Sequence, residues 1–293
     1  MILELKPYTT PEHQPFSLGD SPRKAMIIHG FPGTPAEVRT LAHQLYLLGW
    51  EVHAPLLPGF GVEIANLNQK TRHDWINSVL EQWTALQSDG IECMLVGYSM
   101  GAAVAIHAAS VLPPDKMVLI SPFWHTPGIF AILVALARRL APNLRLFKNA
   151  DFNDPRIRDL FASILPETDL DDPSVQGYIR TQFKLPLAAL EEVTRMGRNA
   201  YRLAKEIQVE TLVLQGDNDP IVLPANTKRL VKHLGKEQVC YYEIQAGHNL
   251  LEADSVQFAH LSSVVANFAD DGCIPIYLSA LNQFQYQPEQ LLK

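Results

Sequence analysis

The chain has 293 residues, of which 47% are hydrophobic and 19% are charged. This balance is ordinary for a globular protein and excludes a disordered or fibrous chain. The formal net charge of −7 comes without a basic run, so we expect no nucleic-acid partner. Cys93, Cys240 and Cys273 lie far apart, with no metal or redox spacing. Such an odd and sparse set predicts thiols in a reducing compartment, packed as small apolar groups.

No segment of the sequence predicts secretion or insertion into a membrane. Residues 1–6 lack the apolar core of a signal peptide. The longest apolar run, residues 129–137, is far shorter than the ~20 residues that span a bilayer. We therefore expect a cytoplasmic protein with no integral membrane association.

Short apolar runs alternate with helical patterns along the first 120 residues, which is typical of βα units and a mostly parallel sheet. Two capping-box patterns, Thr34 with Glu37 and Thr71 with Asp74, predict the starts of the first two helices. A third helix, predicted over residues 100–112, is rich in small side chains that let it lie close to a sheet. Strands are predicted at residues 25–29, 51–57, 93–98 and 116–120.

The alternation stops after residue 122 and resumes near residue 210. The intervening residues 123–209 contain several prolines and helical stretches but no convincing strand. Strands at 211–215 and 239–244, with helices at 225–234 and 254–268, then continue the earlier pattern. The sequence thus predicts an α/β core formed by residues 1–122 and 210–293, interrupted by a helical insertion at 123–209.

One motif stands between a predicted strand and a predicted helix. Residues 97–101 read Gly-Tyr-Ser-Met-Gly, a G-x-S-x-G pattern. The turn that this context requires is so sharp that bulky neighbours of the serine would clash. It lifts the Ser99 hydroxyl to the edge of the sheet and directs a helix N-terminus at it. Ser99 is therefore the candidate nucleophile.

A nucleophilic serine needs a base and an acid that orients the base. Asp217 and Asp219 follow one predicted strand, and His248 follows the next. Because the carboxyl ends of parallel strands meet at one edge of a sheet, these loops can converge on Ser99. We expect Asp219 to be the acid, since Pro220 holds it extended, and Asp217 to be a turn former.

The oxyanion that develops during acyl transfer needs backbone N–H donors. Met100, directly after the candidate nucleophile, supplies one donor at the helix N-terminus. The loop of residues 29–33, His-Gly-Phe-Pro-Gly, supplies the other. Pro32 has no N–H, so Phe31 is the expected donor, and His29 is expected to brace the loop by hydrogen bonding.

These motifs together resemble the α/β-hydrolase superfamily, and the segment from His29 to Trp75 resembles the monoacylglycerol-lipase-like carboxylesterases of bacteria. The sequence departs from the latter at residues 58–61, Pro-Gly-Phe-Gly, where many relatives have Gly-His-Gly. The superfamily resemblance is carried by residues 29–33, 97–101, 216–219 and 247–248.

The resemblance implies that residues 123–209 form a cap over the site. The apolar run 129–137 then forms a buried cap helix, a lining for an acyl chain or a contact with a lipid surface. Trp124, His125 and Phe130 are candidate pocket residues, as are Phe161 and Phe183, although each can also serve in packing.

The implied activity is that of a serine hydrolase that cleaves small-molecule carboxylic esters of apolar acyl groups, with Ser99, Asp219 and His248 as its triad. No metal or organic cofactor is implied. Thioesters, lactones, amides and carbon–carbon bonds stay open as substrates, because the same acyl chemistry serves them. A non-catalytic binding protein that retains the hydrolase shell is the alternative from another class.

Overall fold

The computed structural model describes residues 6–87, 90–126, 141–165, 168–234 and 239–273. Its centre is a seven-stranded sheet in the order β1-β3-β2-β4-β5-β8-β9, and the pairs from β3 to β9 are all parallel. The strands are β1 (Phe16–Leu18), β2 (Arg23–Ile28), β3 (Glu51–Ala54), β4 (Glu92–Tyr98), β5 (Lys116–Ile120), β8 (Glu210–Gly216) and β9 (Val239–Ile244). The mostly parallel sheet predicted from the alternation is confirmed.

The sequence pattern missed the edge strand β1. This strand has only three residues, none of them fully buried, and it pairs antiparallel with β3. A strand this short leaves no apolar run or clear alternation in the sequence. These three residues form a strand only because β3 supplies their hydrogen-bond partners.

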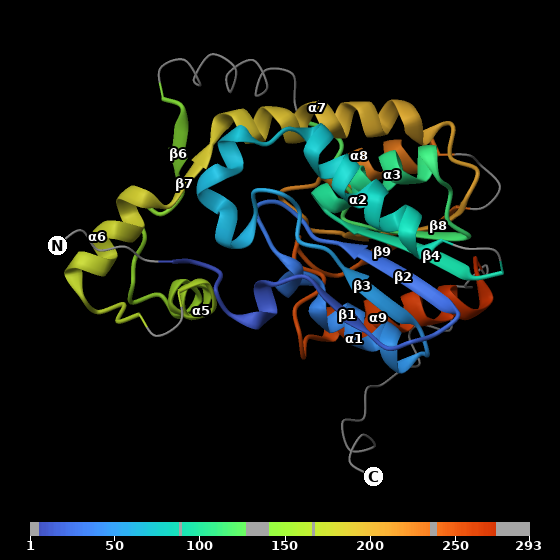
Figure 1. Ribbon diagram of the computed structural model, residues 1–293, viewed down its shortest axis with the longest axis horizontal. Helices are drawn as coiled ribbons and strands as arrows, with labels where there is room; N and C mark the ends of the chain where they lie inside the picture. The colour runs from blue at the N-terminus through green and yellow to red at the C-terminus, as the bar shows by residue number, and fades with distance from the viewer. Residues whose placement is uncertain (1–5, 88–89, 127–140, 166–167, 235–238, 274–293) are drawn as a thin grey trace, which may run out of the picture.

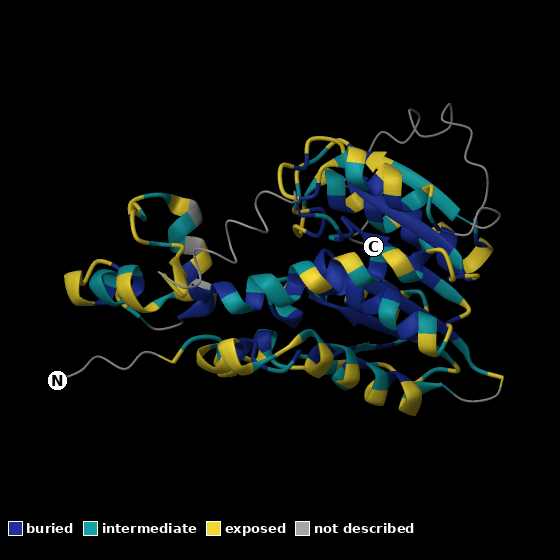
Figure 2. Cartoon of the chain, turned by 90° about the horizontal axis from the view of Figure 1, so that it is seen from above, coloured by how far each residue is buried: buried dark blue, intermediate teal, exposed yellow. Residues whose placement is uncertain are grey.

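Helices cover both faces of the sheet (Figure 1). One face packs against α1 (Arg39–Leu47) and α9 (Val256–Asp271). The other packs against α2 (Arg72–Leu86), α3 (Met100–Val111), α7 (Leu187–Ala204) and α8 (Pro224–Val231). Neighbouring residues of β4 point to opposite faces, so Met94 joins the first core and Leu95 the second. Figure 2 shows the central strands as almost continuously buried, as expected for a sheet covered on both sides.

The two predicted capping boxes have different outcomes. The box of Thr71 and Asp74 forms at the start of α2, where the Asp74 carboxylate accepts the Thr71 N–H at 2.7 Å. The box of Thr34 and Glu37 is wrong. Here the chain first makes the 3₁₀ helix η2 (Pro35–Val38), whose cap Thr34 accepts the Ala36 N–H, while the Glu37 carboxylate turns to the Gly30 N–H.

In the described part of residues 123–209, two short strands occur that the sequence did not predict. These are β6 (Asn143–Arg145) and β7 (Lys184–Pro186), which pair antiparallel. Strands of three residues carry too little periodicity to be read from a sequence. The expectation of an insertion without strands is therefore wrong in this detail.

The helices of the same region fall into two packing groups. α5 (Pro155–Ile164) and α6 (Pro173–Gln182) share an apolar cluster of their own around Phe161 and Ile179, and they lie apart from the sheet (Figure 1). α7 instead packs along α3. The apolar run 129–137, with Phe130, lies outside the described residues.

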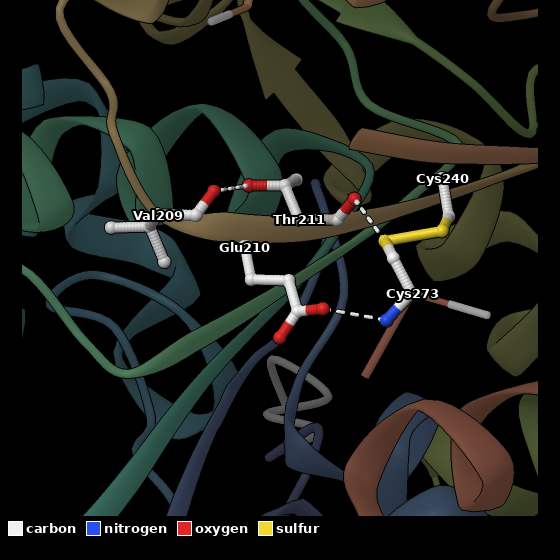
Figure 3. The surroundings of a disulfide bond; sticks show 5 residues. All are labelled: Val209, Glu210, Thr211, Cys240 and Cys273. Atoms are coloured by element: carbon white, nitrogen blue, oxygen red, sulfur yellow. Dashed lines mark hydrogen bonds between the residues drawn. A yellow bond between two sulfur atoms is a disulfide. The ribbon is translucent and has the colours of Figure 1, made fainter. Parts of the chain in front are cut away.

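Two of the three cysteines contradict the expectation of free thiols. Cys240 on β9 and Cys273 after α9 form a disulfide with a Cα–Cα distance of 5.7 Å. Their neighbourhood in Figure 3 also contains the hydrogen bond from the Cys273 N–H to the Glu210 carboxylate. The sequence separation of 33 hid the pairing, because only the return of α9 along β8 and β9 brings the two cysteines together. Cys93 is a buried free thiol.

The structure also describes two further 3₁₀ helices, η1 (Pro11–His13) in the N-terminal segment and η3 (Gly61–Gln69) after β3. Within the described ranges, no helix combines the length and the apolar character needed to cross a bilayer.

Candidate active site

Ser99 occupies the sharp turn between β4 and α3. Its backbone angles are φ 53° and ψ −115°, a conformation that costs free energy in a non-glycine residue. A Cβ on Gly97 would lie 2.4 Å from the Ala102 Cα, and one on Gly101 would lie 2.2 Å from the Ile28 oxygen. Both neighbours must therefore be glycine for β4 and α3 to meet at this angle.

Three side chains from distant parts of the sequence meet at this turn. The His248 Nε2 lies 3.1 Å from the Ser99 Oγ, and its Nδ1 lies 2.8 Å from the Asp219 Oδ2. Ser99 and Asp219 are 7% and 2% exposed, so the contacts are largely shielded from water. β4, β8 and β9 bring the three residues to the carboxyl edge of the sheet.

The surroundings of Asp219 keep it ionised and fixed. Its Oδ1 accepts the N–H groups of Ile221 and Val222, both at 2.8 Å. Burial opposes the charge, but the hydrogen bonds from His248 and from these two N–H groups outweigh it and lower the pKa of Asp219. An anionic Asp219 can accept the Nδ1–H of His248 and stabilise the imidazolium.

Gln215 is a residue that the sequence interpretation missed. It is fully buried in β8, and its Nε2 donates to the Asp219 Oδ2 at 3.1 Å and to the Val222 oxygen at 3.0 Å. The buried Thr227 hydroxyl donates to its Oε1. The available signal was one amide side chain at the end of an otherwise apolar strand.

Asp217 has a different position from Asp219. It is exposed, and its Oδ1 accepts the Ala246 N–H at 3.1 Å and the Asn218 amide at 2.8 Å. These bonds tie the loop after β8 to the loop that carries His248. Of the two aspartates, the structure thus brings Asp219 to the imidazole and leaves Asp217 in the turn.

The loop of residues 29–33 lies beside Ser99 and is held by His29. The buried His29 Nε2 accepts the Leu57 N–H at 3.1 Å, so its proton is on Nδ1, which donates to the Gly30 oxygen at 2.8 Å. Burial lowers the pKa of His29 to about 4, which keeps the ring neutral near pH 7. His29 braces the loop as expected.

The two candidate oxyanion donors belong to this loop and to α3. Phe31 is half-buried, and it belongs to the peptide group whose oxygen His29 holds. Met100 is the first residue of α3, where an N–H has no intrahelical acceptor. Both N–H groups belong to backbone that adjoins Ser99.

A cavity of about 500 Å³ opens beside the same loop. Its largely apolar wall comes from the N-terminal segment, the loop with η2, residue Ile64, and parts of the described residues 141–165 and 168–186. The lining residues are Tyr8, His13, Pro32, Gly33, Thr34, Ala36, Glu37, Ile64, Leu146, Phe147, Leu160, Ile164, Phe183, Lys184 and Leu185.

The expected pocket residues have different surroundings. Phe183 lines the cavity, and Phe161 is buried in the cluster of α5 and α6. The Trp124 indole donates to the Asn226 oxygen at 2.9 Å and stacks on the Tyr201 ring, with 4.0 Å between centroids. His125 contacts the Trp124 ring. Neither Trp124 nor His125 is among the residues that line the cavity.

Phe60 occupies the place where the resemblance suggested a Gly-His-Gly turn. Its ring is fully buried and packs edge-on against His29 and Phe31. Phe60 therefore packs against the loop of residues 29–33 through apolar contacts. In the described part of the chain, no group of three or more His, Cys, Asp or Glu residues is arranged to hold a metal ion.

The sheet, its helices and the position of Ser99 define an α/β-hydrolase. A solved structure described as a metagenome-derived lipolytic enzyme superimposes with a TM-score of 0.70, covering 88% of this chain and 98% of its own, at 19% identity. The sequence model of the serine aminopeptidase S33 family matches residues 20–254, and the chain belongs to that family.

Curated relatives extend the similarity to named bacterial enzymes. The thermostable monoacylglycerol lipase of Bacillus sp. (strain H-257) is 26% identical over 213 residues, which are 73% of this chain and 77% of that lipase. The carboxylesterase of Bacillus subtilis (strain 168) is 30% identical over 101 residues, which are 34% of this chain and 41% of that enzyme. The resemblance that the motifs indicated is confirmed.

Proposed function

We propose that this protein is a serine hydrolase that cleaves carboxylic esters of apolar acyl groups through an acyl-enzyme. The observation that carries the proposal is the hydrogen-bonded series Ser99–His248–Asp219. The loop of residues 29–33, which adjoins Ser99 at Gly30, also contributes Pro32 and Gly33 to the lining of a largely apolar cavity. Relatives named monoacylglycerol lipase and carboxylesterase support the ester as the bond that is cleaved.

In the proposed mechanism, the His248 Nε2 takes the Ser99 hydroxyl proton as the Oγ attacks the ester carbonyl carbon. Asp219 stabilises the imidazolium that forms. The N–H groups of Phe31 and Met100 bind the oxyanion of the tetrahedral intermediate. The intermediate collapses as His248 gives the proton to the leaving alcohol, which leaves the acyl group on Ser99.

A water molecule then attacks the acyl-enzyme, again with His248 as the base. The proton returns to Ser99 as the carboxylic acid leaves. This sequence uses only the three side chains, the two N–H groups and water. The proposal includes residues 123–209 as a cap, since α5 contributes Leu160 to the cavity wall, β7 contributes Leu185, and Phe183 at the end of α6 lines the same cavity.

A series of p-nitrophenyl esters tests the substrate class. Each methylene buried in an apolar cavity contributes up to ~0.8 kcal/mol, so kcat/KM should rise from the acetate and then fall once the cavity is full. Concentrations must stay below those at which micelles form. A maximum at acetate with a steady decline would exclude the apolar acyl pocket.

A fluorophosphonate probe tests the nucleophile and separates an enzyme from a binding shell. The wild-type protein should be labelled on Ser99, as mapped by mass spectrometry, and Ser99→Ala should lose both labelling and turnover while it keeps its fold. An adduct on another serine would contradict the assignment. A folded protein without any label would support the non-catalytic alternative.

The proposed cytoplasmic location is tested by the state of one cysteine pair. Disulfides persist in oxidising compartments and are rare in the cytosol. In a cytoplasmic protein, the disulfide between Cys240 and Cys273 would form only after lysis. Both cysteines should therefore be alkylated as thiols if cells are lysed directly into a thiol-blocking reagent. A bonded pair in that experiment would overturn the cytoplasmic location.

A further inference from the structure

The carboxylate of Glu37 lies against the loop that carries Phe31. Its Oε2 accepts the Gly30 N–H at 3.1 Å. A Cβ on Gly30 would lie 3.3 Å from this oxygen and equally 3.3 Å from the Ser99 Cβ. Glu37 is also part of the cavity wall. The carboxylate therefore adjoins the loop at Gly30, the residue that also lies beside Ser99.

The shape of the loop depends on this carboxylate. A Cβ added to Gly33 would lie 2.0 to 2.2 Å from the carboxyl carbon and both oxygens of Glu37. Any residue other than glycine at position 33 must therefore displace the carboxylate. The loop and Glu37 fit together through Gly30, which supplies the donor, and Gly33, which leaves the space.

Both polar groups of Gly30 have partners. Glu37 accepts from its N–H, while its oxygen accepts from the His29 Nδ1 at 2.8 Å and from the Gly33 N–H at 3.3 Å. A planar trans peptide group holds its C=O and the following N–H in opposite directions. With Gly30 fixed on both sides, the direction of the Phe31 N–H is fixed as well.

We propose that Glu37 is a positioning residue, which holds the Gly30 N–H so that the Phe31 N–H is directed at the oxyanion. This inference rests on the proposed function, because it assigns a role in the transition state of acyl transfer. Glu37 acts through backbone and takes no proton from the substrate. It acts as a hydrogen-bond acceptor, so a neutral acceptor of the same shape can replace it.

Two substitutions separate the acceptor from the charge. Glu37→Leu removes the acceptor, whereas Glu37→Gln keeps an oxygen for the Gly30 N–H. Loss of a whole oxyanion donor costs about 10²–10³-fold in kcat, so a misdirected donor in Glu37→Leu should cost roughly 10–100-fold. KM should change little, and Glu37→Gln should recover kcat to within about threefold of wild type.

A matched control tests whether the loss of any hydrogen bond between a carboxylate and a backbone N–H lowers kcat. The Asp115 Oδ2 accepts the Cys93 N–H at 2.7 Å, near the opposite end of β4 from Ser99. Asp115→Leu removes a comparable bond between a carboxylate and a backbone N–H, and it should leave kcat unchanged. Circular dichroism and thermal melting should confirm that each variant is folded before its kinetics are compared.

A transition-state analogue distinguishes positioning from a general structural defect. The Ki of a trifluoromethyl ketone, which forms a tetrahedral adduct with the serine, should rise in Glu37→Leu by the same factor as kcat/KM falls. Equal Ki values for wild type and Glu37→Leu would overturn the proposal. So would a folded Glu37→Leu variant with wild-type kcat.

Gly33→Ala gives an independent route to the same defect, because its Cβ displaces the carboxylate. Its loss of kcat should resemble that of Glu37→Leu, and the double variant should be no worse than either single variant. Losses that multiply would overturn the proposal. Gly177→Ala is the control, since a Cβ there meets nothing within 4 Å.

The amide resonance of Gly30 supplies a readout that needs no activity. In NMR spectra it should move upfield in Glu37→Leu and stay near its wild-type position in Glu37→Gln. An unchanged resonance in Glu37→Leu would overturn the proposal. If the wild-type protein cleaves no ester although Gly30 responds, the proposed function fails while the contact between Glu37 and the loop stands.

Discussion

Asp217 and Asp219 are two residues apart, yet their surroundings assign them different roles. The preference for Asp219 came from its place before Pro220, which favours an extended backbone. The structure adds two N–H groups on its Oδ1 and the imidazole on its Oδ2. Asp217 instead joins two loops through the Ala246 N–H. At this scale, function follows from which atoms each carboxylate can reach.

The two aspartates should therefore respond differently to replacement by asparagine. Asp219→Asn loses the charge that orients and stabilises His248 and should lower kcat by about 10³–10⁴-fold. Asp217→Asn keeps an oxygen for the Ala246 N–H and should lose less than about tenfold. Steady-state kinetics on one ester, with folding checked by circular dichroism, measures both. Reversed effects in folded variants would make Asp217 the acid.

Glu37 and His29 should make stability depend on pH in opposite directions. Desolvation of the carboxylate by the surrounding protein raises the pKa of Glu37 from its ordinary 4.5 to about 7. The hydrogen bond from Gly30 and the nearby His248 lower this pKa, but by less. Between pH 4.5 and 7 the folded protein holds a proton that the unfolded chain has released. Stability from this group is therefore complete below pH 4.5 and is lost as the pH rises through 7.

For His29 the sign is reversed. Burial lowers its pKa from 6.5 to about 4, so the unfolded chain binds the proton first as the pH falls. Because the buried ring stays neutral, the free energy of unfolding should fall by on the order of 3 kcal/mol as the pH is lowered from 6.5 to 4. In the wild-type protein this loss overlaps with the gain from Glu37, and the two partly cancel.

Glu37→Gln should separate these contributions. The difference in unfolding free energy between the variant and wild type should shift in favour of the variant as the pH rises from 4.5 to 7, and then stay constant. Urea denaturation at several pH values measures it. A flat difference would contradict the raised pKa of Glu37.

Glu192 provides the opposite control. Burial alone would raise the pKa of Glu192, but the hydrogen bonds from Arg72 outweigh burial, and the net effect lowers this pKa below 4.5. The contribution of Glu192 to stability is therefore present above pH 4.5 and is lost on acidification. Glu192→Gln should be less stable than wild type near pH 7, and its deficit should shrink as the pH falls below 4.5. Equal pH profiles for the two variants would show that the measurement does not resolve the individual groups.

At the scale of elements, the same local signal gave two outcomes. Thr71 and Asp74 form hydrogen bonds with each other at the exposed start of α2, so the capping box forms as its sequence pattern predicts. Thr34 and Glu37 carry the same pattern, but the Gly30 N–H competes for the carboxylate and the buried His13 ring for the Thr34 hydroxyl. A tertiary partner thus overrides a local one.

The link between β9 and the end of α9 should contribute to stability. Closing a loop over 33 residues with a disulfide stabilises a protein by about 2–4 kcal/mol in the chain-entropy account. Cys273→Ser should lower the unfolding free energy by that amount under oxidising conditions. Urea denaturation with and without a reductant measures it.

The reductant provides the internal comparison for this prediction. It should destabilise the wild-type protein and leave Cys273→Ser unchanged. Cys93→Ser is the matched control, because Cys93 is a buried free thiol and its replacement should not remove the response to reductant. A wild-type protein that ignores the reductant would show that Cys240 and Cys273 remain thiols.

At the scale of the whole molecule, the cavity is built from four separate parts of the chain, one of which is Ile64 on η3. The N-terminal segment supplies Tyr8, the loop after β2 supplies Gly33, and the region from β6 to β7 supplies Leu146 and Phe183. The Tyr8 N–H donates to the Ile164 oxygen at 2.7 Å, which joins the N-terminal segment to α5. The walls thus depend on the insertion and the core being folded together.

Narrowing this cavity should change the preferred chain length. Leu146→Trp adds bulk to a wall and should move the maximum of the p-nitrophenyl series to a shorter acyl group. Each excluded methylene costs up to ~0.8 kcal/mol, which is about fourfold in kcat/KM. Val111→Trp, at an exposed position outside the cavity lining, should leave the maximum in place. An identical shift in both variants would show that the chain does not enter this cavity.

The sequence by itself determined the α/β class, the order of the βα units and the turn that carries Ser99. These features depend on apolar periodicity and on glycine and proline chemistry within a few residues, which a linear sequence contains. The order Ser99, Asp219, His248 was also predictable, because the carboxyl ends of parallel strands meet at one edge.

Only the tertiary structure decided which side chains from distant parts of the sequence meet. The amide of Gln215 on Asp219, the carboxylate of Glu37 on Gly30 and the pairing of Cys240 with Cys273 all join residues that local patterns treat separately. Short strands such as β6 escaped prediction because their partner, not their composition, makes them strands. Contacts of this kind depend on how whole elements pack, and no local pattern contains that information.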